Sequence, residues 1–420
     1  MATIKPIRAL RYTQKAGALS TCVCPPYDIV GDAEYTSLCD ANEHNLIRLE
    51  LPRGGEDRYA NAGALLSEWL ADGILAKDEK AGIYLYRESF EVAGKAYAFD
   101  GLVCLVGLVP FSERVVLPHE ETLSKAKDDR FRLMCATGCN FSSVYSLYRD
   151  TEGTVRGIIR DAQSLPVLEE FTDSEGVTHT LRKIECEETI NALVNAFADK
   201  QLFIADGHHR YETALNFQNH LATEGNPKGL QADCMLMTLV DLEDDGLVVL
   251  PTHRLIRDLP VDKTDFLAKA SAYFDITECD DVKKAEEILN AHKDKHAFAL
   301  YTGGNGFTLL VGNEKADALF VEGRSEAYAR LDVTVLHTLL LEQVLGIDRE
   351  NMAKQINLRY TRSAEEAVAS VESGESTAAF LLNATKIEEI RAVAEAGDKM
   401  PQKSTYFYPK LKTGLVMNQL

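Results

Sequence analysis

The strongest constraint on the fold of this chain is an abrupt change of pattern that begins at residue 202. Residues 202–205 are all apolar, which predicts a buried strand, and Asp206-Gly207 then interrupts the run with a pair typical of turns. From residue 211 to residue 221, apolar side chains recur at helical spacing. The pattern therefore predicts a strand, a tight turn and a helix in direct succession.

The first turn of this expected helix carries His208, His209 and Arg210. The amino end of a helix attracts anions, because its first backbone N–H groups lack partners within the helix and its dipole is positive there. A helix start with only a structural role usually carries Asp, Glu or Ser. The segment therefore indicates a site for a phosphate or a carboxylate. In the structural alternative, Asp206 caps the helix and the histidines pack or pair locally.

Composition and charge exclude several classes of partner. The 420 residues are 45% hydrophobic, which is enough for a large core divided between two or more domains. The formal net charge of -20 opposes binding to DNA or RNA, because that affinity depends on neutralising phosphates. The apolar runs are too short to span a bilayer, and the first residues lack the layout of a secretion signal. We therefore expect a cytoplasmic protein with reduced cysteines and without nucleic-acid or membrane partners.

Strand and helix patterns follow one another along the chain, which predicts a mixed α/β (α+β) fold. Strands are expected at residues 45–51, 83–92 and 95–109, and the last two form a hairpin. Residues 235–240 and 247–250 flank an acidic turn and are expected to form a second hairpin.

The character of the chain changes after Pro260, where short amphipathic helices become frequent. A further hairpin is expected at residues 297–311, around the glycine-rich tip 303–306. We expect a core domain of residues 1–261 plus 375–420 and a second α/β lobe of residues 262–374.

A charged segment at residues 118–130 is the second candidate for chemistry. Glu120 or Glu121 is suited to act as a general base, or to hold a divalent ion that bridges phosphates. Lys125 and Arg130 are suited to pair with phosphate oxygens. The structural alternative is a solvated charged loop.

Lys403, Ser404 and Thr405 form the third candidate segment. They are similar to the end of a phosphate loop, but no glycine-rich lead-in precedes them, so a Walker-type loop is not expected. A lysine and two hydroxyls are suited to hold a phosphate or a substrate carboxylate. In the structural alternative, this segment is a C-terminal strand whose aromatic residues fill the core.

Two shorter segments supply candidate substrate contacts. Tyr27 and Asp28 follow two prolines in a rigid turn, and His253 and Arg254 stand beside an expected hairpin strand. Side chains of these types suit the recognition of a small polar molecule. Taken alone, each segment also fits an ordinary surface turn.

The stretch Gly207-His208-His209-Arg210-Tyr211-Glu212 resembles the Gly-Cys-His-Arg-Tyr-Glu stretch of sulfiredoxins. It also resembles the helix-start motifs of ParB-type domains and of the free-serine kinases that share their fold. In those relatives the strand–turn–helix binds nucleotide phosphates, so the resemblance implies a ParB/sulfiredoxin-like core. Across its whole length the chain resembles a bacterial and archaeal family of unassigned function, marked by residues 25–28, 119–130, 204–215, 251–254 and 400–410.

Departures from these relatives narrow the activity that the resemblance implies. His208 stands where sulfiredoxin has its cysteine, so the thiol nucleophile is missing and sulfinic-acid repair is not expected. The basic DNA-reading helices that accompany ParB domains have no counterpart in the sequence. The resemblance therefore implies a small-molecule kinase or phosphohydrolase, and free serine is the substrate that the kinase relatives suggest.

We combine these segments in one hypothesis, a phosphotransferase that uses ATP or ADP with Mg²⁺ and acts on a small hydroxyl-bearing metabolite. Phosphate binding is assigned to Gly207, His208, Arg210, Lys125, Arg130, Lys403, Ser404 and Thr405. Catalysis is assigned to Glu120, Glu121, Asp206 and His209, with Glu120 or Asp206 as the base or the magnesium ligand. Substrate contacts are assigned to Tyr27, Asp28, His253 and Arg254, and a homodimer is the assembly considered.

Two alternatives stay open at this point. The same pocket would serve a non-catalytic sensor that binds a nucleotide or a phosphometabolite and signals through the lobe after Pro260. A metal-dependent hydrolase would need His208, His209 and His253 to converge with a carboxylate.

Overall fold

The computed structural model describes residues 1–420 except Leu123, Lys228 and Asn305, and it divides into two compact units. The first unit contains residues 1–118, 122–248 and 409–420, and the second contains residues 119–121 and 249–408. The expected division into 1–261 plus 375–420 and 262–374 stays a prediction. The second unit contains, beyond the residues of the expected lobe, residues 119–121, 249–261 and 375–408.

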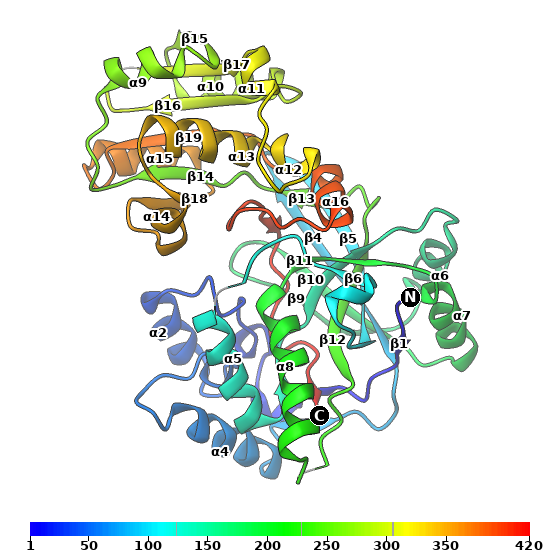
Figure 1. Ribbon diagram of the computed structural model, residues 1–420. Coiled ribbons are helices and arrows are strands. Elements are labelled where there is room, and N and C mark those ends of the chain that lie inside the picture. Colours follow the sequence, from blue (N-terminus) through cyan, green and yellow to red (C-terminus); the bar gives the residue numbers. More distant parts are fainter. Residues whose placement is uncertain (123, 228, 305) are drawn as a thin grey trace. The chain divides into compact units, whose positions relative to one another are not determined.

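The first unit is built on a mixed sheet, which contains the strand that leads into the candidate motif (Figure 1). In order across the sheet, the strands are β6 (Val116–Leu117), β11 (Leu202–Asp206), β8 (Val144–Tyr148), β12 (Cys234–Asp241), β5 (Lys95–Gly107), β4 (Ile83–Val92), β10 (Thr178–Ile184) and β9 (Val167–Thr172), with β1 (Ile4–Lys5) beside β5. β6 pairs with β11 and β8 with β12 in parallel, and the other neighbours are antiparallel. The expected hairpin of β4 and β5 is confirmed.

Helices cover this sheet and complete its core. They are α1 (Leu19–Cys22), α2 (Asp32–Ala41), α3 (Ile47–Glu50), α4 (Arg58–Ala71), α5 (Ser124–Thr137), α6 (Thr154–Ala162), α7 (Glu187–Phe197) and α8 (His208–Glu224). Two short ladders, β2 (Leu10–Tyr12) with β3 (Leu75–Lys77) and β7 (Cys139–Asn140) with β21 (Asn418–Gln419), lie outside the main sheet. α5 and α8 pack side by side (Figure 1), which places the segment from residue 124 next to the candidate motif.

The second unit is built on an antiparallel sheet. Its strands, in order, are β15 (Phe274–Cys279), β17 (Phe307–Gly312), β16 (Ala297–Tyr301), β19 (Ala378–Leu382), β14 (His253–Ile256) and β18 (Leu358–Thr361). The expected hairpin of residues 297–311 is therefore confirmed as β16 and β17, and Asn305 at its tip lies outside the described residues.

Successive residues of the central strands of this sheet point to opposite faces, and both faces are covered. Phe380 and Leu382 pack with Phe298 in one cluster, whereas Ala379 and Leu381 pack in another. The helices are α9 (Lys263–Ala270), α10 (Val282–Ala291), α11 (Glu314–Asp317), α12 (Glu326–Ala329), α13 (Asp332–Val335), a π-helix (Leu336–Val344), α14 (Arg349–Lys354), α15 (Ala364–Glu372) and α16 (Ile387–Ala396). The expectation of a mixed α/β fold with an additional α/β lobe is confirmed.

The strand expected at residues 45–51 is wrong, because this segment contains the short helix α3. Asn45 is fully buried, and its side-chain oxygen accepts a hydrogen bond from the backbone N–H of Ile47 at 3.0 Å. Its amide group donates to the carbonyl of Thr21 at 2.8 Å. These side-chain bonds start a helical turn, a local alternative to strand pairing that hydrophobic alternation does not reveal.

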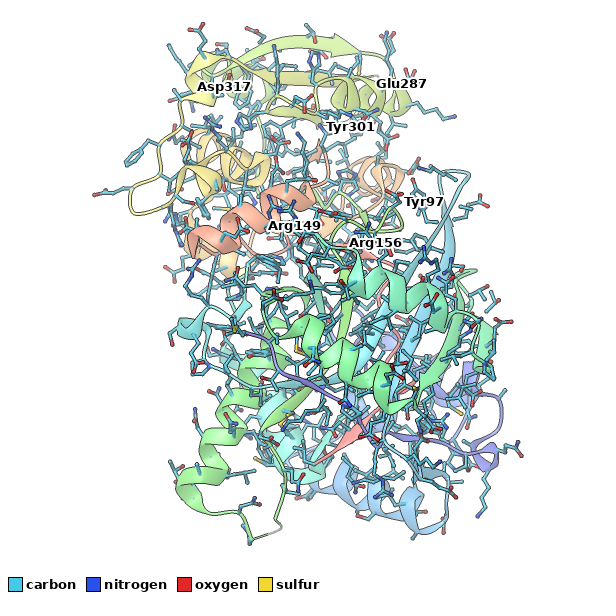
Figure 2. All side chains as sticks on the ribbon, turned by 90° about the vertical axis from the view of Figure 1, so that its right-hand side faces the viewer. Tyr97, Arg149, Arg156, Glu287, Tyr301 and Asp317 are labelled. Carbon is cyan, nitrogen blue, oxygen red and sulfur yellow. The ribbon has the colours of Figure 1, made fainter. Side chains whose placement is uncertain are left out.

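The second expected hairpin, residues 235–240 with 247–250, is also wrong. β12 has β8 and β5 as its neighbours, and the acidic turn directs the chain away from β12. Asp244 accepts a hydrogen bond from the N–H of Gly246 at 2.8 Å, which is an Asx turn and not a two-residue hairpin turn. Figure 2 shows Arg149 and Arg156, which hold this turn through Glu243 at 3.1 and 3.5 Å.

A buried charged network attaches the last segment of the first unit to its sheet. His179 of β10 lies between Glu88, at 3.2 Å from Nδ1, and Asp173, at 3.1 Å from Nε2. Lys412 approaches Asp173 to 2.6 Å. Burial opposes a charged His179, but hydrogen bonds to Asp173 and Glu88 outweigh that penalty, so the pKa of His179 is raised above its ordinary value.

This network should make the stability of the first unit depend on pH. Because the pKa of His179 is higher in the folded state, its contribution is complete below the unfolded value of about 6.5 and is lost as the pH rises through the folded pKa. Replacing His179 by Gln should lower the free energy of unfolding by roughly 3–5 kcal/mol, because the buried Glu88 loses its cation and Asp173 keeps only Lys412.

Denaturant titrations of both proteins from about pH 5 to about pH 9, which start below the unfolded pKa and extend well above it, would measure the effect. His292→Gln, a change at the end of α10, provides the control and should leave the pH profile unchanged. Equal pH profiles for the wild type and His179→Gln would contradict the assignment.

Candidate functional site

The strand, turn and helix expected at residues 202–221 are present in the first unit. β11 ends at Asp206, Gly207 has φ +95°, and α8 begins at His208. A side chain at position 207 would be strained, because a Cβ there would also lie 2.9 Å from the Arg210 guanidinium. The glycine thus lets the chain turn sharply and leaves room for the arginine directly beside the helix start.

Asp206 does not cap α8, contrary to the structural alternative for this motif. The N-cap position is Gly207, which makes no side-chain hydrogen bond to the helix start. The carboxylate of Asp206 instead accepts hydrogen bonds from Arg210 Nη2 at 2.8 Å and from Lys410 Nζ at 3.1 Å. A second Arg210 nitrogen, Nη1, donates to the carbonyl of Ser143 at 2.5 Å. Two cations are therefore held beside the first turn of α8.

The charge state of Asp206 follows from these contacts. Burial disfavours its ionised form, but Lys410 and Arg210 more than compensate, and the pKa of Asp206 lies well below its ordinary value. A carboxylate with so low a pKa is a weak base at neutral pH. The geometry thus favours a role for Asp206 in positioning the two cations over a role as general base.

Arg130 lies in the same unit and approaches the same region. Its guanidinium is buried, donates to the backbone carbonyl of Glu50 at 2.6 Å and lies 4.0 Å from the centre of the Tyr27 ring. Arg130, Arg210 and Glu50 all line one small cavity of about 30 Å³. The structure therefore brings Arg130 and Tyr27 to the side of Arg210, as the shared-pocket hypothesis requires of these residues.

The remaining predicted residues of the first unit have different surroundings. His208 is buried at the start of α8, and His209 is half-buried. Lys125 and Asp28 are exposed.

Three functional candidates of this unit were missed by the sequence analysis. Lys410 binds Asp206, and Lys127 binds Glu212 of α8 at 2.7 Å. Glu50 is buried against Arg130, and burial raises its pKa. An acidic residue within an apolar stretch was the available signal for Glu50. Lys127 and Lys410 lie in segments 119–130 and 400–410, which the sequence singles out, but nothing local distinguishes them from the other basic residues there.

The other predicted residues belong to the second unit, where several of them meet. Glu120 accepts a hydrogen bond from the backbone N–H of Lys403 at 3.1 Å. Thr405 lies 3.1 Å from His119, and Arg254 donates to the carbonyl of Lys403 at 3.2 Å. Segments 119–121 and 400–405, far apart in sequence, are therefore neighbours within this unit.

His253 and Arg254 are buried parts of the second unit, and neither is a surface turn. The ring of His253 accepts a hydrogen bond from the backbone N–H of Leu382 at 3.4 Å, and burial together with Arg254 lowers its pKa to about 4. His253 is therefore neutral at physiological pH. Ser404 is also buried, whereas Glu121 is exposed.

The described residues were also compared with the requirements of a metal site and of a membrane-spanning helix. No group of three or more His, Cys, Asp or Glu side chains in this part of the chain is arranged to hold a metal ion. Among the same residues, no helix combines the length and apolarity needed to cross a membrane.

The strained turn before α8 yields a direct test of the motif. Replacing Gly207 by Ala should destabilise the first unit by about 1–2 kcal/mol or more, because φ is positive there and the added Cβ meets the Arg210 guanidinium. Gly157→Ala in α6 is a matched control, since a Cβ at that position meets no atom within 4 Å. That control should be neutral or stabilising by about 0.5–1 kcal/mol. Denaturant unfolding measures both changes, and equal effects would refute the proposed constraint.

Comparison with known proteins places the chain in a family. A model of the family described as "Protein of unknown function (DUF1015)" matches residues 4–334. A search of curated proteins finds no match.

Several solved structures are similar to the chain, with low TM-scores and low sequence identity. One is a conserved hypothetical protein from Pyrococcus furiosus, at 18% identity and TM-score 0.34, covering 72% of this chain and 92% of that one. A free serine kinase in complex with AMP has 15% identity and TM-score 0.35, covering 72% and 88%. SbnI with C-terminal truncation from Staphylococcus aureus has 8% identity and TM-score 0.36, covering 76% and 87%. These scores carry no argument about activity. The family model spans most of the chain, and the chain therefore belongs to DUF1015, a family of proteins of unknown function.

Proposed function

We propose that the chain is a nucleotide-dependent phosphotransferase and that its first unit binds nucleotide phosphates at the amino end of α8. One observation carries this proposal: Arg210 and Lys410 are both fixed on Asp206 beside a helix start whose cap is a glycine. If Asp206 capped the helix, its carboxylate would occupy the N–H groups that a bound anion needs.

The backbone supplies the first part of an anion site. The first N–H groups of a helix lack partners within the helix, and here no N-cap side chain takes them among the described residues. Gly207 lets a ligand approach the backbone closely, because it has no side chain. The helix dipole adds a favourable field for negative charge at the same place.

The side chains supply the second part. Lys410 and Arg210 bring two positively charged groups to the helix start, where both contact Asp206. Their positions are set before a ligand arrives, so little free energy is lost in ordering them. Phosphoryl transfer relies mainly on such prearranged positive charge, since the protein has little covalent chemistry to perform.

The finer parts of the proposal rest on the sequence. ATP or ADP is the expected nucleotide, a small hydroxyl compound such as free serine is the expected acceptor, and His209, Glu120 and Glu121 are the expected catalytic groups. The phosphate roles of Lys125, Lys403, Ser404 and Thr405 stand as predictions in the same way.

Magnesium is also a prediction, and Asp206 does not fit the role of its ligand. Both of its carboxylate oxygens face cations, Arg210 on one side and Lys410 on the other, which would repel Mg²⁺. Glu120 therefore stands as the predicted ligand.

Lys410 supplies the decisive test of nucleotide binding. Lys410→Met should weaken the binding of ATP, ADP or AMP by roughly 10–100-fold, because a charge-assisted contact to phosphate is lost. Lys412→Met is a matched control, since both lysines have 11% exposed side chains and each binds one aspartate. Calorimetric titration with each nucleotide, with and without Mg²⁺, measures the affinities. A wild-type protein that binds none of the three would overturn the proposal, as would equal losses in the two variants.

The variant Glu120→Gln distinguishes an enzyme from a non-catalytic sensor. If Glu120 acts in catalysis, Glu120→Gln should reduce phosphate transfer to a hydroxyl acceptor by about 10²–10⁴-fold while the nucleotide Kd changes little. Glu326→Gln, at an exposed ion pair of the second unit, is the control. Transfer is followed with labelled ATP or ADP and a panel of hydroxyl-bearing amino acids and sugars. Tight nucleotide binding without transfer to any acceptor would favour the sensor.

A further inference from the structure

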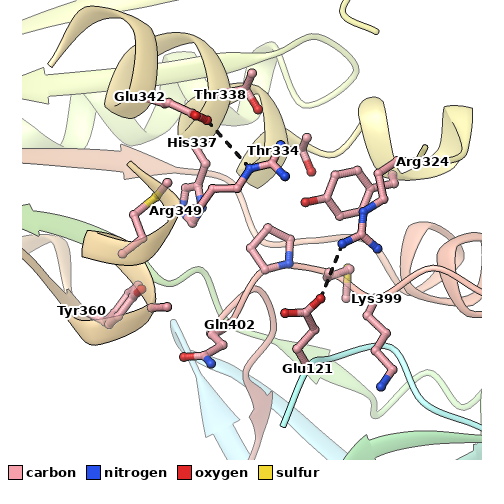
Figure 3. A pocket seen from close by; sticks show the side chains of 15 residues that line it. Glu121, Arg324, Thr334, His337, Thr338, Glu342, Arg349, Tyr360, Lys399 and Gln402 are labelled. Atoms are coloured by element: carbon pink, nitrogen blue, oxygen red, sulfur yellow. Dashed lines mark hydrogen bonds and ion pairs between the residues drawn. The ribbon is translucent and has the colours of Figure 1, made fainter. Parts of the chain in front are cut away.

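A separate pocket lies wholly within the second unit (Figure 3). It has a volume of about 140 Å³. Its walls come from the π-helix Leu336–Val344, from α14, and from the extended segment 399–402, with Glu121 at its edge. None of the phosphate-binding residues proposed for the first unit takes part in it.

The π-helix gives this pocket an unusual wall. Leu336, Leu339 and Leu340 of this helix are buried in the hydrophobic core, while His337 and Thr338 line the pocket. π-helices are rare, since their wider turns pack less well, and they occur frequently at functional sites. One face of the π-helix therefore packs in the core, and another face presents polar groups to the pocket.

Two loose ion pairs border the pocket at separate places, as Figure 3 shows. Arg324 lies 3.4 Å from both Glu121 and Asp398, and Arg349 lies 3.9 Å from Glu342. Both distances exceed those of strong charge-assisted hydrogen bonds, and the side chains are partly exposed. Each pair can therefore accept a charged ligand group at little cost. A further cation, Lys399, also lines the pocket.

Neutral hydrogen-bonding groups complete the lining. Arg254 Nε donates to His337 Nε2 at 3.3 Å, so the proton of a neutral His337 is on Nδ1. Burial and the nearby Arg254 lower the pKa of His337 well below its ordinary value, which keeps the ring neutral. The hydroxyl of Thr334 is buried and makes no hydrogen bond of ordinary geometry in the described part of the chain, although it interacts with the side chain of Tyr328. A buried polar atom in this state is costly unless a ligand or water satisfies it.

We propose that this pocket binds a small zwitterionic amino acid. A ligand with one carboxylate and one ammonium group matches a wall that offers arginines and glutamates in separate pairs, whereas a purely anionic ligand would face Glu121 and Glu342. Size supports the same class, because an engineered cavity of about 150 Å³ holds benzene, a molecule of six heavy atoms. A nucleotide is far too large for a cavity of this volume.

This proposal does not depend on nucleotide binding by the first unit. Apart from Glu121, which is also an expected catalytic group, it concerns a different set of residues, and its test uses no nucleotide. A chain that binds amino acids but no nucleotide would support this site and refute the proposed function, and the reverse result would do the opposite.

The experiment is a calorimetric titration of the full chain with glycine, L-alanine, L-serine and 4-aminobutyrate. Propionate and ethylamine, which each carry only one of the two charged groups, are the comparison ligands. At least one amino acid should bind about tenfold or more tightly than both comparison ligands, because it engages both kinds of charged group. Failure of all four amino acids to bind, or equal affinity for propionate, would overturn the proposal.

Variants locate the binding in this pocket. Arg324→Met and Glu342→Gln should each weaken the amino-acid affinity by about tenfold or more. Arg330→Met removes an exposed arginine that is paired with Glu326 outside the pocket, and should leave the affinity unchanged. Glu342 is partly exposed and lies 3.9 Å from its partner, so Glu342→Gln should fold normally. Unchanged affinity in that variant would refute the assignment even if Arg324→Met failed to fold.

Discussion

The carboxylate of Asp206 joins three parts of the first unit that are distant in sequence. It ends β11, binds Arg210 one turn into α8, and binds Lys410 in the C-terminal segment. A partly buried aspartate at the end of an apolar strand would be costly, and the two cations offset that cost. The same contacts hold two cations beside the helix start. The proposed phosphate site thus follows from the way this unit stabilises one partly buried carboxylate.

A second buried pair extends this principle toward the N-terminal segment. Arg130 and Glu50 are almost completely buried and lie 3.6 Å apart, with Asp129 binding the same guanidinium at 2.5 Å. The Tyr27 ring covers the guanidinium. Removing one member of such a cluster leaves an uncompensated charge, so these residues hold each other in place. Their rigidity favours the precise placement that a phosphate site needs.

The second unit carries its buried charge within its sheet. Its antiparallel sheet is covered on both faces, so its central strands are apolar throughout. Arg254 is the charged exception, a fully buried guanidinium that binds the carbonyls of Thr252 and Lys403 and the ring of His337. His253 beside it on β14 and Thr308 on β17 are buried polar residues as well. The bonds of Arg254 connect β14 to segment 400–405 and to the π-helix. The proposed amino-acid pocket therefore lies against a polar cluster that the sheet itself carries.

Local sequence was sufficient to predict the strand, the turn at Gly207 and the helix with its cationic first turn, because strand and helix periodicity and the needs of a tight turn act over a few residues. It also determined the mixed α/β class and the hairpins β4–β5 and β16–β17. Only the tertiary structure decided that Lys410 binds Asp206, that Glu50 binds Arg130, that residues 45–51 contain a helix, and that β12 pairs with β8 and β5. Those outcomes depend on which buried charges and open strand edges the folded chain brings together, and no periodicity along the chain records such distant pairing.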